Sequence, residues 1–371
     1  LRTPGSRAVG DGRDPATYGF DLGNCLVPRA QIAATGLPRD GMPVLDLPPL
    51  AGVAVVDSLA GEGRKKYLVP GDRVIGVTLG GQARAYPLIV LNWHEIVNDT
   101  LGGVPITVTY SPLCDAVAVF DRRQAPPTPG EARDQPPAPD ESRGGGNLPS
   151  GPGEVLEFGH SGLLYNSNLL MYDRGRPGQE SLWCQLQARA IAGPAAARGD
   201  SLRLIPSQLV RWEDWKTLHP HTTVLARDPL RAQRYRREPY TSYYGSDLLR
   251  YPTAPLPGGD ALALKTPCLI LGYAGEWTVV PLPVIEARSA GSTRRCSVEA
   301  GGRSVPLVYH DRPPTVVIGG DTVVIGGDAG VIGGDAGDTG ESSRELPHDL
   351  QIMHAFWFAW YATHPEAVAL H

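Results

Sequence analysis

The thiol of Cys114 and the imidazole of His94 are the side chains of this sequence best suited to metal binding or nucleophilic chemistry. Zinc and copper favour sulfur and imidazole ligands. One hypothesis is therefore a soft or borderline metal site, zinc or copper, formed by Cys114 and His94 and completed by His160 or Cys184. A second hypothesis is a Cys-dependent enzyme, in which Cys114 is the nucleophile and His94 is a base oriented by Glu95.

Amide, phenol and carboxylate side chains recur inside apolar stretches close to these residues. An unsatisfied buried polar group costs roughly 1–3 kcal/mol, so we expect these side chains to meet in one concave site. A third hypothesis is a non-catalytic binding or structural module in which the same residues are structural. The partner would then be a small ligand, a metal ion or another protein. The expected ligand-binding residues are Tyr165, Asn166, Asn168, Asp173 and Gln185.

Several other classes of site are excluded. The run that starts at His94 resembles the zinc motif His-Glu-x-x-His, but Asn98 replaces the second histidine. Leu163 stands where a Gly-x-Ser-x-Gly elbow needs its last glycine, and no phosphate-binding glycine loop occurs. The 34 Lys and Arg against 39 Asp and Glu give a net charge of −5, which disfavours nucleic acid. No apolar run approaches the roughly 18 residues needed for a transmembrane helix.

The elements that would position these residues are mostly short strands. Short β-like runs at 74–79 and 83–88 flank Gly80-Gly81, which predicts a hairpin. Residues 104–110 and 116–120 also favour strands, and 89–97 has helix-compatible spacing. We therefore predict a strand-dominated α+β fold. Residues 1–66 are rich in glycine and proline and indicate an extended arm with one strand at 53–56.

An aromatic motif occurs twice. Trp212-x-x-Trp215-x-x-x-His219-Pro recurs as Trp357-x-x-Trp360-x-x-x-His364-Pro. This spacing keeps the aromatic residues on one face of a helix, and the proline ends that helix. We infer two related β-rich modules, at 67–228 and 262–371, each closed by an aromatic helix.

Two low-complexity segments interrupt these modules. Residues 121–153 combine many prolines and glycines with scattered charges, and residues 315–342 repeat Val-Ile-Gly-Gly-Asp. Such compositions bury too little apolar surface to offset the entropy of ordering. We predict flexible insertions in hairpins, the first between paired strands at 117–120 and 155–158.

Long motifs give the chain a family resemblance. They include Leu-Asn-Trp-His-Glu-Ile-Val-Asn-Asp at 91–99, Gly-Leu-Leu-Tyr-Asn-Ser-Asn-Leu-Leu-Met-Tyr-Asp-Arg at 162–174 and Ser-Leu-Trp at 181–183. Over residues 67–371 the sequence resembles the prokaryotic family catalogued as domain of unknown function 3179. The resemblance implies an exported or lipid-anchored, extracytoplasmic protein. Family members commonly have Tyr-Cys-Pro-Leu-Cys, whereas this chain has Ser111 at the second position, which leaves Cys114 as a single thiol.

Overall fold

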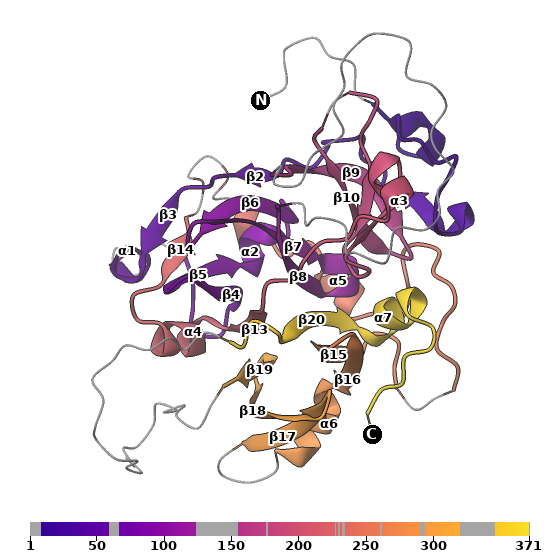
Figure 1. The fold of residues 1–371 in the computed structure, drawn as a ribbon. Helices are drawn as coiled ribbons and strands as arrows, with labels where there is room; N and C mark the ends of the chain where they lie inside the picture. Colours follow the sequence, from indigo (N-terminus) through magenta and orange to yellow (C-terminus); the bar gives the residue numbers. More distant parts are fainter. Residues whose placement is uncertain are drawn as a thin grey trace, which may run out of the picture.

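The computed structural model describes residues 9–58, 67–123, 155–175, 177–226, 228, 231, 234–259, 262–289, 294–319 and 346–370. Strands dominate these residues and helices are short, which confirms the predicted strand-dominated α+β class. Figure 1 shows the strands gathered into several sheets that pack against one another.

A seven-stranded sheet lies at the centre of the fold and is buried on both faces. Successive side chains along each strand point to opposite faces of the sheet. On β8, Val117 and Val119 therefore belong to one apolar cluster, whereas Ala118 and Phe120 belong to another. In spatial order the strands are β16 (Glu276–Pro281), β15 (Pro267–Tyr273), β20 (Gln351–Phe356), β8 (Ala116–Asp121), β7 (Val104–Ser111), β6 (Ile96–Leu101) and β2 (Leu45–Asp46).

Two five-stranded sheets cover the two faces of this central sheet. The first packs Val74 and Leu209 against its valine-rich face, and the second packs Leu169 and Trp183 against its other face. The first sheet contains β13 (Ser207–Arg211), β4 (Arg73–Leu79), β5 (Gln82–Pro87), β14 (Thr223–Leu225) and β3 (Leu50–Gly52). The second contains β1 (Ile32–Ala34), β9 (Phe158–Tyr165), β10 (Asn168–Asp173), β11 (Leu182–Cys184) and β12 (Arg189–Ala192).

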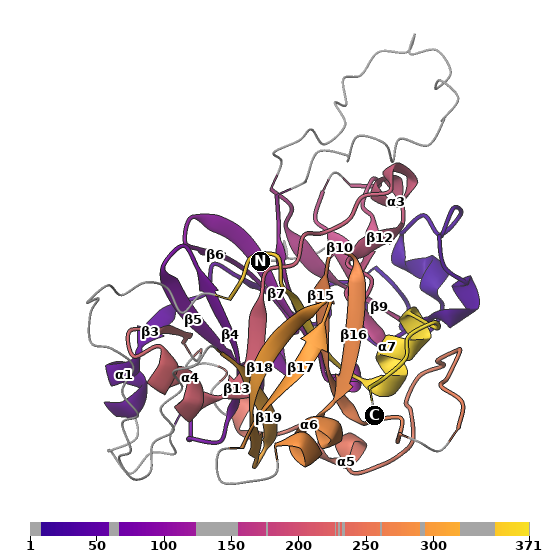
Figure 2. The ribbon, with the colours of Figure 1, turned by 60° about the horizontal axis from the view of Figure 1, so that its bottom comes forward.

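A three-stranded sheet, seen in orange in Figure 2, packs with helix α6 on β15 and β16. Its strands are β17 (Arg295–Ala300), β18 (Arg303–Asp311) and β19 (Pro314–Ile318). The helices are α1 (Val53–Ser58), α2 (Leu88–Leu91), α3 (Pro194–Arg198), α4 (Trp212–Leu218), α5 (Thr241–Tyr244), α6 (Leu282–Arg288) and α7 (Trp357–Thr363). Among the described residues, no helix is long and apolar enough to cross a bilayer.

The described part of the N-terminal arm is integrated into all three large sheets. β1 pairs with β9, β2 with β6, and β3 with β14. The strand expected at 53–56 was wrong, because these residues begin helix α1. Short apolar runs do not distinguish a strand from a helix by periodicity alone. The helix-compatible run 89–97 likewise contains only one short helix, α2, before β6 begins at Ile96.

The two aromatic helices occupy similar surroundings. α4 follows β13, which pairs with β4, and α7 follows β20, which pairs with β15. After each helix the chain returns in parallel beside the second strand of the hairpin, at Val224 next to Ala85 on β5 and at Ala369 next to Val279 on β16. These matching pairings are consistent with an internal duplication, which stays a prediction. Three strands of the second module, β16, β15 and β20, also belong to the central sheet, which they join where β20 pairs with β8.

Most of the two predicted insertions, 124–153 and 320–342, lies outside the described residues. Residues 315–318 belong to β19. The pairing expected between 117–120 and 155–158 was wrong, because β8 pairs with β7 and β20, and only an isolated bridge joins Arg123 to Val155.

Candidate functional site

A buried polar cluster lies between the central sheet and the β9–β12 sheet. Alternation along β7 turns Thr109 toward the second sheet, where its hydroxyl oxygen accepts a hydrogen bond from Gln185 Nε2 at 2.8 Å. The same amide donates to the carbonyl of Ala116 at 3.1 Å. The Gln185 side chain therefore joins the loop after β11 to two strands of the central sheet.

Asn168 extends this cluster at the start of β10. Its Nδ2 donates to Gln185 Oε1 at 2.8 Å, and its Oδ1 accepts from the backbone N–H of Leu186 at 3.2 Å. The thiol of Cys184 lies 4.0 Å from the same oxygen. Ser111 accepts a hydrogen bond from the backbone N–H of Leu169 at 3.3 Å. These contacts satisfy the polar groups within the protein.

Cys114 lies beside this cluster in the turn after β7 and is fully buried. Burial raises the pKa of its thiol far above the usual range, although Asn168 and Ser111 act in the opposite direction. Burial also raises the pKa of Cys184 to about 12. Because the thiolate is the reactive form of a cysteine nucleophile, burial works against a nucleophilic role for either cysteine.

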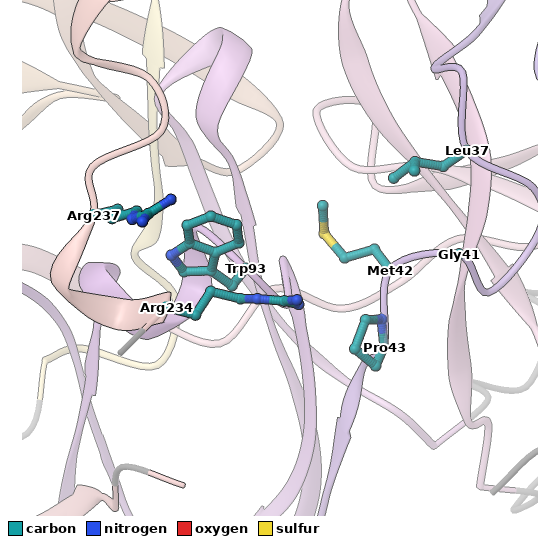
Figure 3. A pocket seen from close by; sticks show the side chains of 7 residues that line it. All are labelled: Leu37, Gly41, Met42, Pro43, Trp93, Arg234 and Arg237. Carbon is teal, nitrogen blue, oxygen red and sulfur yellow. The ribbon is translucent and has the colours of Figure 1, made fainter. Parts of the chain in front are cut away.

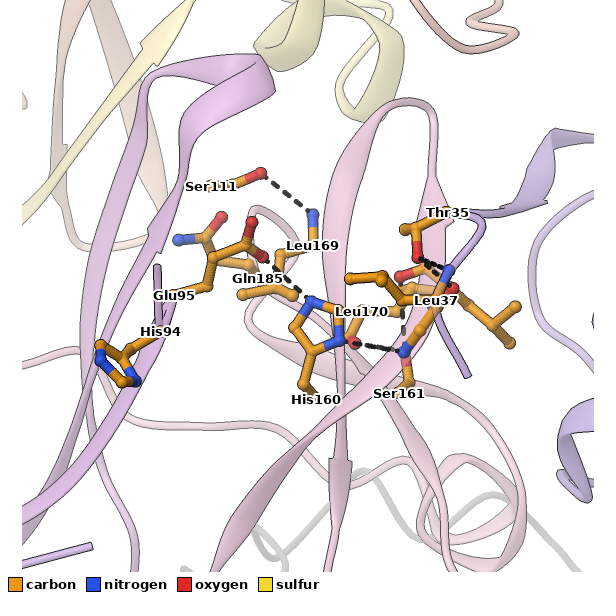
Figure 4. A network of polar contacts seen from close by, with 12 residues as sticks. Thr35, Leu37, His94, Glu95, Ser111, His160, Ser161, Leu169, Leu170 and Gln185 are labelled. Atoms are coloured by element: carbon orange, nitrogen blue, oxygen red, sulfur yellow. Dashed lines mark hydrogen bonds and ion pairs between the residues drawn. The ribbon is translucent and has the colours of Figure 1, made fainter. Parts of the chain in front are cut away.

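Glu95 and His160 form a buried pair next to Cys114. The Oε2 atom of Glu95 lies 3.2 Å from Nε2 of His160 (Figure 4). The other ring nitrogen, Nδ1, accepts a hydrogen bond from the backbone N–H of Gly162 at 3.2 Å. In the neutral tautomer the ring proton is therefore on Nε2, which donates to the carboxylate.

The backbone explains why Glu95 faces His160. Its φ of 55° lies in the left-handed region, which is uncommon for a residue other than glycine, and it separates the end of α2 from the start of β6. Figure 4 shows His94 directed away from the Glu95 carboxylate and His160. The expectation that Glu95 orients His94 is corrected accordingly, since the partner of Glu95 is His160.

His94 forms its contacts on the other side. Its Nδ1 lies 2.6 Å from the carbonyl oxygen of Pro43, and its Nε2 lies 2.8 Å from the hydroxyl of Tyr235. Burial lowers the pKa of the imidazole to about 4, so the ring is neutral at pH 7. Both ring nitrogens are therefore occupied, and neither is directed at Cys114.

Three further predicted ligand-binding residues have structural contacts. Asn166 Nδ2 donates to the carbonyls of Ala254 and Ala362, at 3.0 and 2.9 Å. Asp173 accepts from the backbone N–H of Ser181 at 2.7 Å and from Trp183 Nε1 at 3.0 Å. Burial raises the pKa of the Asp173 carboxyl and of the phenol of Tyr165, a member of the apolar cluster between the β9–β12 sheet and the arm.

The four candidate metal ligands do not form a binding group. Within the described residues, which include His94, Cys114, His160 and Cys184, no three His, Cys, Asp or Glu side chains are arranged to hold a metal ion. Cys114 and Cys184 belong to the cluster around Asn168, and His160 bonds to Glu95. His94 bonds to different segments on the far side of Glu95.

A pocket of about 660 Å³ opens beside His94 (Figure 3). One wall comes from the N-terminal arm and the other from the end of α2 and from the 3₁₀ turn Arg234–Arg236. A volume of 300–1,000 Å³ is typical of small-molecule sites. The lining residues are Leu37, Gly41, Met42, Pro43, Trp93, Arg234 and Arg237.

His94 links the two walls of this pocket. Its Nδ1 bonds to Pro43 on one wall, and its Nε2 bonds to Tyr235, which lies in the turn that carries Arg234. The sequence motif that contains His94 therefore lies directly beside this pocket. The four arginines between 231 and 237 are the signal in the sequence that could have indicated the second wall.

The layered sheets and the internally bonded polar cluster define a strand-rich α+β protein with an arginine-lined pocket between its arm and its first unit. The family model described as "Protein of unknown function (DUF3179)" matches residues 39–367, and the chain belongs to this family. The match includes Gly41, Met42 and Pro43, so residues from both walls of the pocket lie within the family's domain. No curated protein and no solved structure matches the chain.

Proposed function

We propose that this protein is a non-catalytic binding module that holds a small ligand in the pocket between Met42 and Trp93. The observation that carries the proposal is a pocket of about 660 Å³ whose two walls are joined through one buried imidazole. When a pocket is largely formed before binding, the protein segments around it lose less conformational entropy as the ligand binds.

The polar residues that could have formed a catalytic or metal site are hydrogen-bonded to other parts of the protein, which supports a binding module over an enzyme or a metal site. Gln185, Asn168 and Asp173 direct their hydrogen bonds to neighbouring strands and backbone groups. A buried network that is satisfied in this way fixes how sheets pack. A thiol whose pKa is raised by burial, as in Cys114, is protonated at neutral pH.

A ligand screen with a filled-pocket variant tests the proposal. A ligand that binds only the folded state stabilises it by about 2.7 kcal/mol at one hundred times its Kd. We expect some members of a metabolite library to raise the melting temperature of the wild type and to have no effect on Met42→Trp, whose indole would occupy the pocket. Equal shifts in both proteins, or no stabilising compound, would contradict the proposal.

Metal analysis tests the competing hypothesis. We expect purified protein to carry no stoichiometric zinc or copper after growth with either metal. Stoichiometric metal that is lost in Cys114→Ser, but kept in Cys296→Ser on β17, would favour a thiol and imidazole site over the binding module.

A further inference from the structure

The charged residues among the described lining of the pocket are both positive. These residues are Arg234 and Arg237, and no carboxylate occurs among the described residues that line the pocket. Figure 3 shows Arg234 extending past Trp93 toward the wall that carries Pro43. A guanidinium has five donors in a planar fork that matches the oxygens of a carboxylate. The pocket therefore offers donors and positive charge to a bound group.

The acidic residues close to this wall have other partners. Asp228 pairs with Arg231 at 3.4 Å. Glu238 accepts from Asn92 Nδ2 at 2.7 Å and from the backbone N–H of Tyr240 at 3.1 Å. Among the described residues, no carboxylate forms an ion pair with the two pocket arginines. Their charge is not neutralised by this part of the chain.

The remaining surface of the pocket is apolar. Leu37, Met42 and Pro43 form one side, and the indole of Trp93 faces them (Figure 3). The guanidinium carbon of Arg234 lies 5.5 Å from the centre of the Trp93 ring, within the range of a cation–π contact. This contact holds the arginine beside a flat apolar surface and leaves the edge of its guanidinium for hydrogen bonding.

We propose that the ligand is a small organic anion, with a carboxylate bound by Arg234, further positive charge supplied by Arg237 from the other side of Trp93, and a flat apolar body packed between Trp93 and Met42. The inference rests on the proposed binding function and adds the chemical class of the ligand. A neutral amide of the same shape would lose charge-assisted hydrogen bonds, which are about twice as strong as neutral ones.

Calorimetric titration with matched pairs of probes tests this proposal. The probes are aromatic carboxylates, including 2-naphthoate, each compared with its own primary amide, and inorganic phosphate as an anion without an apolar body. We expect at least one carboxylate to bind about tenfold or more tightly than its amide, and phosphate to bind more weakly than that carboxylate. The affinity should fall as salt is added.

Arginine variants assign the binding to this pocket. Arg234→Gln should weaken binding of the carboxylate about tenfold or more, Arg237→Gln should weaken it by a smaller factor, and both should leave binding of its amide unchanged. Arg303→Gln is the matched control, because this arginine pairs with Asp349 outside the pocket. Melting curves of all three variants show whether they fold as the wild type does.

Two results would overturn the anion proposal and leave the binding function standing. One is that neutral library compounds bind to the pocket but no carboxylate binds more tightly than its amide. The other is that carboxylate binding is unaffected by either pocket substitution. If no compound of any class stabilises the wild type over Met42→Trp, the proposed binding function itself fails.

Discussion

The hydroxyl of Tyr235 donates a hydrogen bond to Nε2 of His94 at 2.8 Å. The direction follows from the other side of the ring, where the carbonyl of Pro43 can only accept and therefore fixes the proton on Nδ1. The ring is thus a neutral connector between two segments that are far apart in sequence. Its position gives His94 a mechanical role in shaping the pocket.

Tyr235→Phe should weaken this connection. The substitution removes the donor to a buried imidazole nitrogen, at a cost of roughly 1–3 kcal/mol in the free energy of unfolding. Urea unfolding measures this cost. Tyr273→Phe is a control, since no hydrogen bond is seen between the Tyr273 hydroxyl and a described residue, although the side chain is buried. Equal stability of Tyr235→Phe and the wild type would show that the hydrogen bond between Tyr235 and His94 does not stabilise the two walls of the pocket.

Acid should destabilise the fold through its buried histidines. Burial lowers the pKa of His94, His354 and His364 from 6.5 to about 4. As the pH falls below 6.5, the unfolded chain binds these protons before the folded chain does. The stability that the neutral rings provide is complete above pH 6.5 and is lost progressively down to pH 4, by about 1.4 kcal/mol per pH unit for each histidine.

Denaturant titrations between pH 7 and pH 4 measure this slope. His364→Gln should make the free energy of unfolding less dependent on pH across that window. A stability that does not change between pH 6.5 and pH 4 would mean that the buried rings are protonated in the folded state.

Local sequence signals predicted the scaffold well. The short β-like runs on either side of Gly80-Gly81 form the β4–β5 hairpin, in which both glycines have positive φ, at 57° and 74°. The run 104–110 lies within β7. Trp215 and Trp360 lie on the predicted aromatic helices, and both are buried. These features depend on neighbouring residues, so periodicity and turn chemistry are sufficient to find them.

The site was harder to predict because it depends on contacts between distant segments. The backbone of Glu95 is left-handed. As a result, the Glu95 carboxylate faces His160, whereas the imidazole of His94 is directed away from it. No pattern in residues 91–99 specifies that turn. The pocket likewise forms between Met42 and Pro43 on one side and Arg234 on the other. Sequence spacing does not predict that these distant segments lie close together.

Thiol labelling distinguishes a structural Cys114 from a reactive one. Cys25 and Cys296 are partly exposed, whereas Cys114, Cys184 and Cys268 are buried. Burial raises the pKa of Cys268 to about 12, and thiolate is the reacting species. Ellman's reagent should therefore modify two thiols rapidly in the native protein and all five after denaturation. The number of rapidly modified thiols should be unchanged in Cys114→Ala. A decrease by one would support the hypothesis of a Cys-dependent enzyme.

The two aromatic helices offer a paired test of how far their similarity extends. Trp215 and Trp360 each precede a histidine that lies against the indole, with ring centres 4.1 and 3.9 Å apart. Their indole N–H groups differ. Trp215 Nε1 donates to Thr222 Oγ1 at 2.9 Å, whereas Trp360 Nε1 is buried without a partner among the described residues.

Trp215→Phe should therefore destabilise the protein more than Trp360→Phe. Both substitutions remove the same volume from a buried site, but only the first removes a hydrogen bond, which contributes about 0.5–1.5 kcal/mol. The second removes a buried donor that has no partner in the described part of the chain, which offsets part of its packing loss. Urea unfolding of both variants, with Trp→Ala at each position as a reference for a loss of roughly 3–5 kcal/mol, measures the difference. A larger loss for Trp360→Phe would show that packing of Trp360 against Trp277, at 5.2 Å between ring centres, outweighs the hydrogen bond of Trp215.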